Sequence, residues 1–368
     1  MELTFERKRL FSGYDGKTCK VVPCMDTDGG QTLLSWRDLL LTGSDVFYGT
    51  YIARSADGGR SFSAPERQTA LADTFADGIR TTYCGEIHYS RFHRRWYGLG
   101  NTEQYTDDRH PVLIPGTWLT AGIKPLYLTV DGETSTVTGH SPLPFPYEHR
   151  SAMPFGKPLE LPDGDILVPF YYNTPTADKY QVSVVRYTFT PGGLEPRAVG
   201  EPLTAPQSNR GLCEPSLSAF GGKYYLTLRT DEKGLWAESA DGMNFSAPRP
   251  WVWENGEEIG NYNTQQHWLR SPEGLWLAYT RRGANNDHVF RHRAPVFAAP
   301  FDAERGCLIR EKECVLVPEL GARLGNFCTV DISPEESWLI TAEWMQPAGC
   351  EKYGSDNSFW FVRIHWEK

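Results

Sequence analysis

The stretch SADGGRSFSAP at residues 55–65 returns almost unchanged as SADGMNFSAP at residues 239–248. Each copy follows an alternating segment and places Asp-Gly where a tight hairpin turn needs positive backbone angles. Phe62 and Phe245 are expected to fold back over their turns. Because serine, aspartate, glycine and the aromatic residue keep their order 184 residues apart, the pattern indicates an internal repeat rather than two unrelated hairpins.

The rest of the chain divides at the same phase into six units of roughly 60 residues, and the recurrence spans about three of them. Four-stranded blades arranged around an axis suit such units, because each blade leaves only short edges. The sequence therefore predicts a single all-β domain over 1–368, a six-bladed β-propeller, with seven blades as the alternative. The N-terminal segment 2–12 is a spare strand, expected to close the ring beside 358–366. The second strands of the units are predicted at 31–38, 95–101, 165–173, 223–231, 274–282 and 337–344.

Composition limits the classes of function. Aromatic residues make up 13%, and 35 Gly with 26 Pro suit short strands joined by tight turns. The net charge of −9 disfavours an extended nucleic-acid surface, and no apolar run reaches the length of a membrane span. The start of the chain lacks the apolar core of a signal peptide, so a cytoplasmic location is expected, with the eight cysteines reduced. No metal-binding motif occurs, and no cofactor is expected.

Three segments carry a resemblance to a known family. SADGGRSF is similar to the Asp-box, S-x-D-x-G-x-x-W/F, of the sialidase superfamily, and the second copy is one residue shorter. The segment at 20–38, KVVPCMDTDGGQTLLSWRD, resembles the start of sialidases. The segment at 213–230, CEPSLSAFGGKYYLTLRT, looks like the blade that carries a catalytic glutamate and a binding arginine. The resemblance implies a glycoside hydrolase that acts on an acidic saccharide.

The resemblance also implies three arginines that clamp the carboxylate of the substrate, a geometry that lysine copies badly. The second arginine falls on Arg229 and the third on Arg291 or Arg293. Arg291 and Arg293 are two apart, so both are expected on the same side of a strand. The first arginine falls near Lys20, which departs from the family pattern. A local positive pocket is expected in spite of the negative net charge.

For the chemical step, the resemblance places the catalytic glutamate of the family on Glu214 and its acid/base aspartate on Asp45 or Asp38. The family's nucleophilic tyrosine falls on Phe327, whose phenyl ring cannot attack an anomeric carbon. Tyr353 is the nearest late tyrosine, and it is expected not to reach Glu214. Hydrolysis through the tyrosine of the family is therefore in doubt for this chain.

Propeller geometry adds further candidates. The loops that lead into the first strand of each blade and those between its second and third strands should gather on one face. The side chains that this arrangement adds to the site are His88 and His149 as catalytic groups, with Arg37, Tyr172 and His267 as substrate-binding groups.

Two alternatives to hydrolysis stay open. The segment at 279–300, YTRRGANNDHVFRHRAPVFAAP, also looks like propellers that act on uronic-acid polysaccharides, including ulvan lyases. That resemblance implies elimination with His88 or His149 and Tyr171 or Tyr172 as acid and base. The other alternative is a propeller that binds carbohydrate without catalysis.

Overall fold

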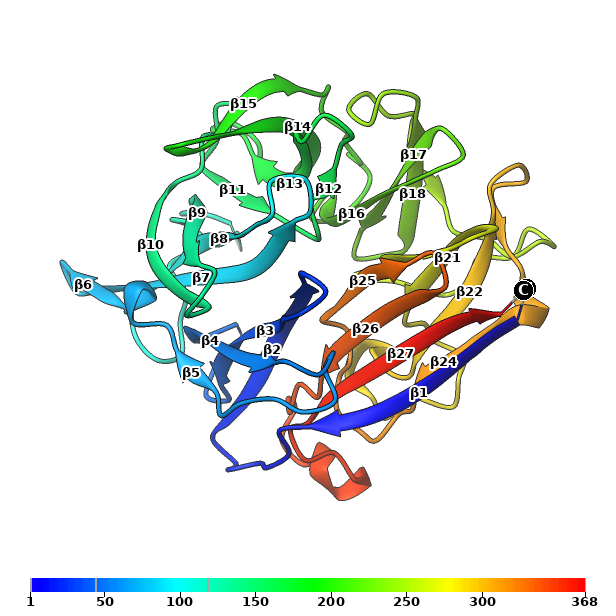
Figure 1. Cartoon of the computed structure of the whole chain (residues 1–368), viewed down its shortest axis with the longest axis horizontal. Helices are drawn as coiled ribbons and strands as arrows, with labels where there is room; N and C mark the ends of the chain where they lie inside the picture. Colours follow the sequence, from blue (N-terminus) through cyan, green and yellow to red (C-terminus); the bar gives the residue numbers. More distant parts are fainter. Residues whose placement is uncertain (1, 44, 118, 368) are drawn as a thin grey trace.

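The computed structural model describes residues 2–43, 45–117 and 119–367 of the chain. Six antiparallel sheets are arranged in a ring around a central axis (Figure 1). The six-bladed β-propeller predicted from the sequence is confirmed. All eight cysteines are free thiols. No helix in the described part of the chain is long and apolar enough to cross a membrane.

Apart from a short extra strand at the start of blade 2, each blade starts with its innermost strand and ends at the outside of the ring. Blade 2 carries an extra short strand, β6 (Thr74–Ala76), and blade 3 carries β12 (Leu159–Glu160). From inside to outside, the strands of blades 1 to 3 are β2 (Thr18–Thr27), β3 (Thr32–Leu40), β4 (Phe47–Ser55) and β5 (Glu66–Arg67); β7 (Ile79–Ser90), β8 (Arg95–Tyr105), β9 (Pro125–Asp131) and β10 (Thr136–Pro142); and β11 (Ser151–Pro154), β13 (Ile166–Asn173), β14 (Gln181–Thr190) and β15 (Gly193–Val199).

Blades 4 to 6 follow the same plan. In blade 5, two short strands pair with the third strand of the blade. From inside to outside, their strands are β16 (Cys213–Phe220), β17 (Lys223–Arg229), β18 (Gly234–Ser239) and β19 (Arg249–Pro250); β20 (His267–Ser271), β21 (Gly274–Tyr279), β22 (Val296–Asp302), β23 (Cys307–Leu308) and β24 (Cys314–Val317); and β25 (Phe327–Ser333), β26 (Glu336–Ala342), β27 (Phe359–Glu367) and β1 (Glu2–Leu10).

The N-terminal strand closes the ring. β1 pairs antiparallel with β27 along its whole length, from Glu2 opposite Glu367 to Leu10 opposite Phe359. Figure 1 shows the blue β1 beside the red β27 at the outer edge of blade 6. The predicted pairing of the two chain ends is confirmed, so blade 6 is built from both ends of the sequence.

The hydrophobic core lies between neighbouring blades. Trp236 and Trp251 from blade 4 pack against Trp268 and Phe301 from blade 5, for example, and all four side chains are buried. Aromatic side chains of this size bury large apolar areas and interlock the sheets. The high aromatic content of the sequence therefore serves the contacts that hold the ring together.

The two repeated stretches form the same turn, each between the third and fourth strand of its blade. In the first copy, the Ser55 hydroxyl donates to Asp57 at 2.7 Å, and Asp57 accepts the backbone N–H of Ser61 at 2.8 Å. In the second copy, Ser239 donates to Asp241 at 2.8 Å, and Asp241 accepts the N–H of Met243 at 2.9 Å. The repeat is therefore a structural unit as well as a sequence pattern.

Candidate active site

A cavity of about 680 Å³ lies at the end of the ring where the loops between second and third strands meet the starts of the innermost strands. Its lining is unusually rich in charged side chains for a protein with a negative net charge. Seven arginines face four carboxylic acids, so the cavity has a positive formal charge. These side chains are Arg37, Arg109, Arg210, Arg229, Arg291, Arg293 and Arg323, with Asp45, Glu86, Glu103 and Glu214.

Four of the arginines converge on one asparagine. The side-chain oxygen Oδ1 of Asn263 accepts hydrogen bonds from Arg210 at 3.0 Å and from Arg291 at 3.4 Å, and it also accepts one from Arg229. The backbone oxygen of Asn263 accepts the Nε of Arg293 at 3.1 Å. Asn263 itself adopts the left-handed conformation, with φ 49°. All four guanidinium groups are therefore hydrogen-bonded to the same residue and lie close together.

Only part of this positive charge is neutralised inside the cluster. Glu214 forms an ion pair with Arg229, and Asp231 binds Arg210 through both carboxylate oxygens. Among the described residues, Arg291 and Arg293 have no carboxylate within ion-pair distance. Burial, together with the charge of Arg229, lowers the pKa of both Arg291 and Arg293. An anion bound between them would relieve this repulsion.

Glu214 is held as an anion. Burial alone would raise its pKa, but Arg229, Arg293 and Arg210 outweigh burial and lower it. Glu214 sits at an irregularity in β16, where the register shifts between Cys213 and Ser216 and its own φ is 46°. This local bulge turns the carboxylate toward Arg229, the last residue of the neighbouring strand β17.

The segment that carries Arg291 and Arg293 differs from the sequence-based expectation. The prediction placed both arginines on one side of a strand. Residues Phe290–His292 instead form a 3₁₀ turn, in which Arg291 and His292 have φ values of 57° and 52°. Two consecutive left-handed residues cannot extend a strand, so β22 begins only at Val296. Both guanidinium groups nevertheless reach Asn263.

The two aspartates proposed as acid/base lie in different places. Asp45 follows β3 and lines the large cavity, whereas Asp38 lies opposite Lys20 in the pairing of β3 with β2 and does not line it. Lys20, at the position of the first family arginine, donates its Nζ to the backbone oxygen of Asn357 at 2.9 Å and is also outside the cavity. Arg37 lines the cavity, and no described residue bonds to its Nε.

Glu103 is a cavity residue that the sequence did not single out. It is 6% exposed, and its Oε1 accepts a hydrogen bond from the Asn101 side chain at 2.9 Å. Burial raises the pKa of Glu103 to about 7, although Arg37 and the Asn101 bond oppose that rise. Near neutral pH the cavity therefore holds a carboxyl group that can carry a proton, alongside the ionised Glu214.

Tyr172 and His149, which propeller geometry predicted at the site, do not line the large cavity. Tyr172 is buried in the aromatic cluster between blades 2 and 3, stacked on Tyr147 at 5.6 Å. Its neighbour Tyr171 lines the large cavity instead, because adjacent residues of a strand point to opposite faces. His149 bonds to the backbone oxygen of Tyr147 at 2.7 Å and packs against Phe145. His149 and Tyr172 therefore do not line the large cavity, in contrast to the expectation from propeller geometry.

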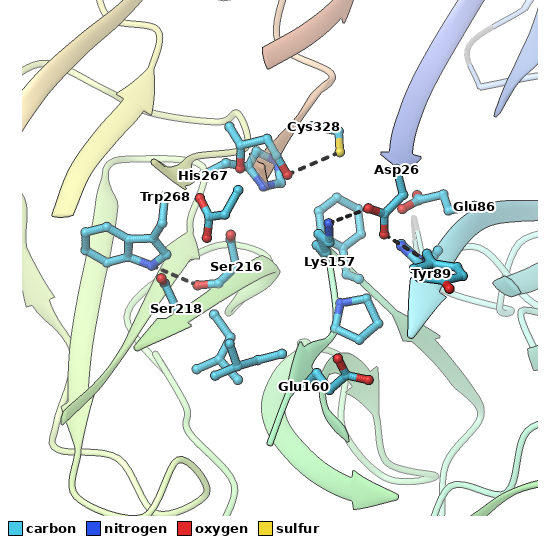
Figure 2. A pocket seen from close by; sticks show the side chains of 18 of the residues that line it. Asp26, Glu86, Tyr89, Lys157, Glu160, Ser216, Ser218, His267, Trp268 and Cys328 are labelled. Atoms are coloured by element: carbon cyan, nitrogen blue, oxygen red, sulfur yellow. Dashed lines mark hydrogen bonds and ion pairs between the residues drawn. The ribbon is translucent and has the colours of Figure 1, made fainter. Parts of the chain in front are cut away.

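A second cavity of about 270 Å³ lies further along the innermost strands. Figure 2 shows Asp26 and Lys157 joined across it, with an Asp26–Lys157 distance of 2.9 Å. His267 borders this smaller cavity and bonds to the Gln265 side chain at 3.0 Å. The ring of His267 lies 4.9 Å from that of Phe327. His267 and Phe327 thus border the smaller cavity and not the large one.

One layer of residues separates the two cavities. His88 belongs to this layer and lies within β7, not in the loop before it. Its side chain is buried, and its Nε2 has no hydrogen-bond partner among the described residues. Burial lowers the pKa of His88 to about 4, so the imidazole is neutral at pH 7. The full set of residues that line both cavities is Val22, Glu86, His88, Phe155, Gly156 and Gln265.

Tyr353 lies away from the cavity. It ends the 3₁₀ turn Cys350–Tyr353, is 44% exposed, and its ring lies 4.6 Å from that of His288. It does not line the large cavity that Glu214 lines. Neither Phe327 nor Tyr353 can therefore supply a phenolic nucleophile beside Glu214.

Sequence reasoning missed Glu103, Asn263 and Arg323. Arg323 lies over the ring of Trp344 at 4.4 Å and binds the Gln346 side chain at 2.9 Å. Glu103 could have been found by extending the alternation of β8 beyond Asn101, since both residues then share a face. Nothing in the local sequence around Asn263 marks it as the residue on which the arginines meet.

Solved structures of other proteins share this fold. A protein of unknown function from Dyadobacter fermentans is 16% identical, with a TM-score of 0.67 and coverage of 99% of both chains. The NanB sialidase from Streptococcus pneumoniae is 9% identical, with a TM-score of 0.62, covering 96% of this chain and 69% of its own. An α-L-arabinofuranosidase from Fusarium graminearum is 11% identical, with a TM-score of 0.59 and coverage of 98% and 97%. The sequence matches no protein-family model and no curated protein. The sialidase-like fold is thus confirmed, and at these identities the likeness shows the fold alone.

Proposed function

We propose that this protein is a glycoside hydrolase that acts on a saccharide bearing a carboxylate group. The observation that carries the proposal is that four arginines that line the large cavity converge on Asn263. Two of them, Arg291 and Arg293, have no carboxylate partner among the described residues. Arginine is the side chain best suited to bidentate binding of a carboxylate, so the cluster supports an acidic substrate.

In this proposal Arg229, Arg291 and Arg293 hold the substrate carboxylate. Arg229 also keeps Glu214 ionised beside the bound sugar. The ionised Glu214 stabilises positive charge that develops at the anomeric carbon in the transition state. The fold likeness to the NanB sialidase and to the arabinofuranosidase agrees with such chemistry but does not by itself assign it.

Hydrolysis also needs a group that protonates the leaving oxygen. Besides Glu214, three carboxylic acids line the cavity, Asp45, Glu86 and Glu103, and our candidates for this step are Asp45 from the β3–β4 loop and Glu103 from β8. The resemblance to sialidases supports Asp45, and the raised pKa of Glu103 supports Glu103. Asp45→Asn and Glu103→Gln separate them. Loss of the proton donor slows substrates with a poor leaving group far more than substrates with an activated one.

The test of substrate class compares fluorogenic glycosides of sialic acid, of a hexuronic acid and of uncharged arabinofuranose. The wild-type protein should hydrolyse an acidic glycoside in preference to the neutral one. Arg291→Ala removes a cationic group, and because no described carboxylate pairs with Arg291, the substitution leaves no carboxylate unpaired. A charge-assisted hydrogen bond contributes about 1.5–3 kcal/mol, so the acidic substrate should bind roughly tenfold to a hundredfold more weakly.

Arg282→Ala is the matched control for Arg291→Ala. Arg282 lies in the same β21–β22 loop but stacks on Tyr262 at 4.2 Å and does not line the cavity. This variant should keep the wild-type KM for the acidic glycoside. A preference for the neutral glycoside, or equal losses in the two variants, would refute the acidic-substrate proposal.

Product analysis distinguishes hydrolysis from the two alternatives. Elimination from a uronate creates a conjugated double bond that absorbs in the ultraviolet, whereas hydrolysis creates only a reducing end. Tyr171 and His88, the pair that elimination would use, both line the large cavity. A protein that binds acidic oligosaccharides and releases neither product would be a carbohydrate-binding propeller.

A further inference from the structure

We propose that Cys24, Glu86 and His88 bind a zinc ion in the layer between the two cavities. Cys24 lies on β2, the innermost strand of blade 1, and Glu86 and His88 lie two residues apart on β7, the innermost strand of blade 2. Residues two apart on a strand project to the same side. One ligand atom from each of the three side chains lies within 4.8 Å of the other two.

The separations fit a tetrahedral zinc ion. The Cys24 Sγ atom lies 3.9 Å from the His88 Nδ1 atom. Zinc bonds of about 2.3 Å to sulfur and about 2.0–2.1 Å to nitrogen place two such ligands about 3.5 Å apart in a tetrahedron. A shift of a few tenths of an ångström would therefore bring Cys24 and His88 to the separation that zinc needs, and the Glu86 carboxylate lies within 4.8 Å of both ligand atoms. Side-chain rotations of this size are available to a cysteine and a histidine on the innermost strands of neighbouring blades.

The chemistry of the three side chains selects zinc over harder cations. A thiolate, an imidazole and a carboxylate form a ligand set that zinc accepts, whereas magnesium and calcium prefer oxygen alone. The thiolate and the carboxylate together carry two negative charges, which one divalent ion neutralises in a buried place. The His88 side chain is 1% exposed, and its Nδ1 atom lies 3.9 Å from the Cys24 sulfur.

The fourth ligand position faces the cavities. Glu86 and His88 line both of them, so a water molecule can complete the tetrahedron from either side. Cys328 borders the smaller cavity (Figure 2), and its Sγ lies 4.0 Å from that of Cys24. Cys328 is not within 4.8 Å of all three ligand atoms, so it is not among the ligands we propose. The site therefore has three protein ligands and one open position.

This proposal is independent of the glycosidase activity. The ion would tie blade 1 to blade 2 beside the axis, where the two blades supply different ligands. It would also occupy His88 and remove that residue as a base for elimination. Its existence is measured by metal content and spectroscopy, without any substrate.

The experiment loads the full chain with zinc or cobalt(II), removes the excess, and measures metal per chain. The wild-type protein should retain about one ion, and the cobalt form should show a thiolate-to-cobalt charge-transfer band with tetrahedral d–d bands. Cys24→Ser should abolish the charge-transfer band. Cys24→Ser, His88→Gln and Glu86→Gln should each weaken binding roughly tenfold or more.

Two matched controls probe side chains of the same kind outside the cluster. Cys19→Ser removes another buried thiol of β2, and His267→Gln removes another buried histidine of the innermost strands. Both should bind cobalt as the wild type does. X-ray absorption at the zinc edge of the wild-type protein should find one sulfur ligand, which needs no variant to fold. Absence of retained metal in the folded wild type, or a charge-transfer band that persists in Cys24→Ser, overturns the proposal.

Discussion

Glu103 and Glu214 line the same cavity, and their surroundings move their pKa values in opposite directions. Glu214 is ion-paired with Arg229 and stays ionised, whereas Glu103 is buried and accepts a hydrogen bond from the Asn101 side chain. Two carboxyl groups with separated pKa values are the usual basis of acid–base chemistry at one pH. The difference also has a consequence for stability, because a raised pKa in the folded state couples folding to pH.

We expect Glu103→Gln to gain stability relative to the wild type as the pH rises. Above about pH 4.3 the unfolded chain releases the proton of Glu103, while the folded protein keeps it until about pH 7. The wild type therefore loses stability across this window, and the neutral glutamine does not. The shift corresponds to about 3 kcal/mol in the free energy of unfolding between pH 4 and pH 8. Urea unfolding at both pH values measures it.

A pH-independent difference between Glu103→Gln and the wild type would mean that Glu103 has the same pKa in the folded and the unfolded chain, and it would contradict the raised pKa of Glu103. The measurement needs no substrate. It therefore tests the environment of Glu103 separately from any role in catalysis.

At the residue scale, the sequence indicated which residues belong to the site better than it indicated which way their side chains point. Motif resemblance singled out Glu214 and Arg229, which form an ion pair. It could not tell that Tyr171 rather than Tyr172 lines the cavity, since that depends on the phase of β13 within its blade. His149 lies outside the cavity for a different reason, because its loop turns the imidazole ring toward Phe145. Long-range convergence, such as four arginines on Asn263, leaves no local signal.

At the scale of elements, the repeated turns contact the neighbouring blade. Gly59, in the first copy, has a φ of 81°, and a Cβ added there would lie 2.8 Å from the Phe361 ring of blade 6. Gly242, in the second copy, has a φ of 77°, and an added Cβ would lie 2.6 Å from Leu167 of blade 3. Glycine is therefore required in both turns by backbone conformation and by space.

We expect Gly59→Ala to destabilise the protein more than Gly221→Ala. Gly221 also has a positive φ, of 60°, but a Cβ added there meets nothing within 4 Å. The left-handed conformation should cost each variant about 1–2 kcal/mol. Contact with Phe361 should cost Gly59→Ala about 1–3 kcal/mol more. Thermal and urea unfolding of the two variants measure the difference, and equal losses would contradict the packing role of the turn.

The strands were the easiest elements to predict. The alternating and aromatic segments assigned as second strands coincide with β3, β8, β13, β17, β21 and β26. Local hydrophobic patterning is sufficient for a strand with one buried face. The strand expected around Arg291 and Arg293 was wrong, because these residues follow the cavity wall, where backbone conformation depends on side chains from other blades.

At the scale of the whole molecule, ring closure depends on β1. Deletion of residues 2–10 would leave the edge of β27 unpaired over its whole length. An exposed strand edge favours pairing with other molecules. We expect the truncated protein to unfold at a lower temperature and to associate in a concentration-dependent way, measured by calorimetry and light scattering. A monomeric truncated protein with unchanged thermal stability would contradict this role for β1.

The number of blades and the pairing of the chain ends could both be predicted from the sequence. The repeated turn gave the length of one unit, and the unpaired N-terminal strand indicated where the ring closes. A positive pocket was also expected, but the sizes of the two cavities and the residues between them were not predicted. They depend on how far the innermost strands stand from the axis, which is decided by packing between blades and not by any one segment.

The pairing of Glu2 with Glu367 places the two ends of the chain side by side, so the chain could start at a different blade without any change in how the blades are arranged in space. A short linker from residue 367 to residue 2 would turn β27 and β1 into an ordinary hairpin, and the chain could then be cut between any two other blades. In such a circular permutant every blade would be a continuous segment, and no strand would join the two ends. The ring would then be closed by contacts between its first and last blades alone. Comparing the stability of the permutant with that of the wild type therefore measures how much the β1–β27 pairing adds to those contacts.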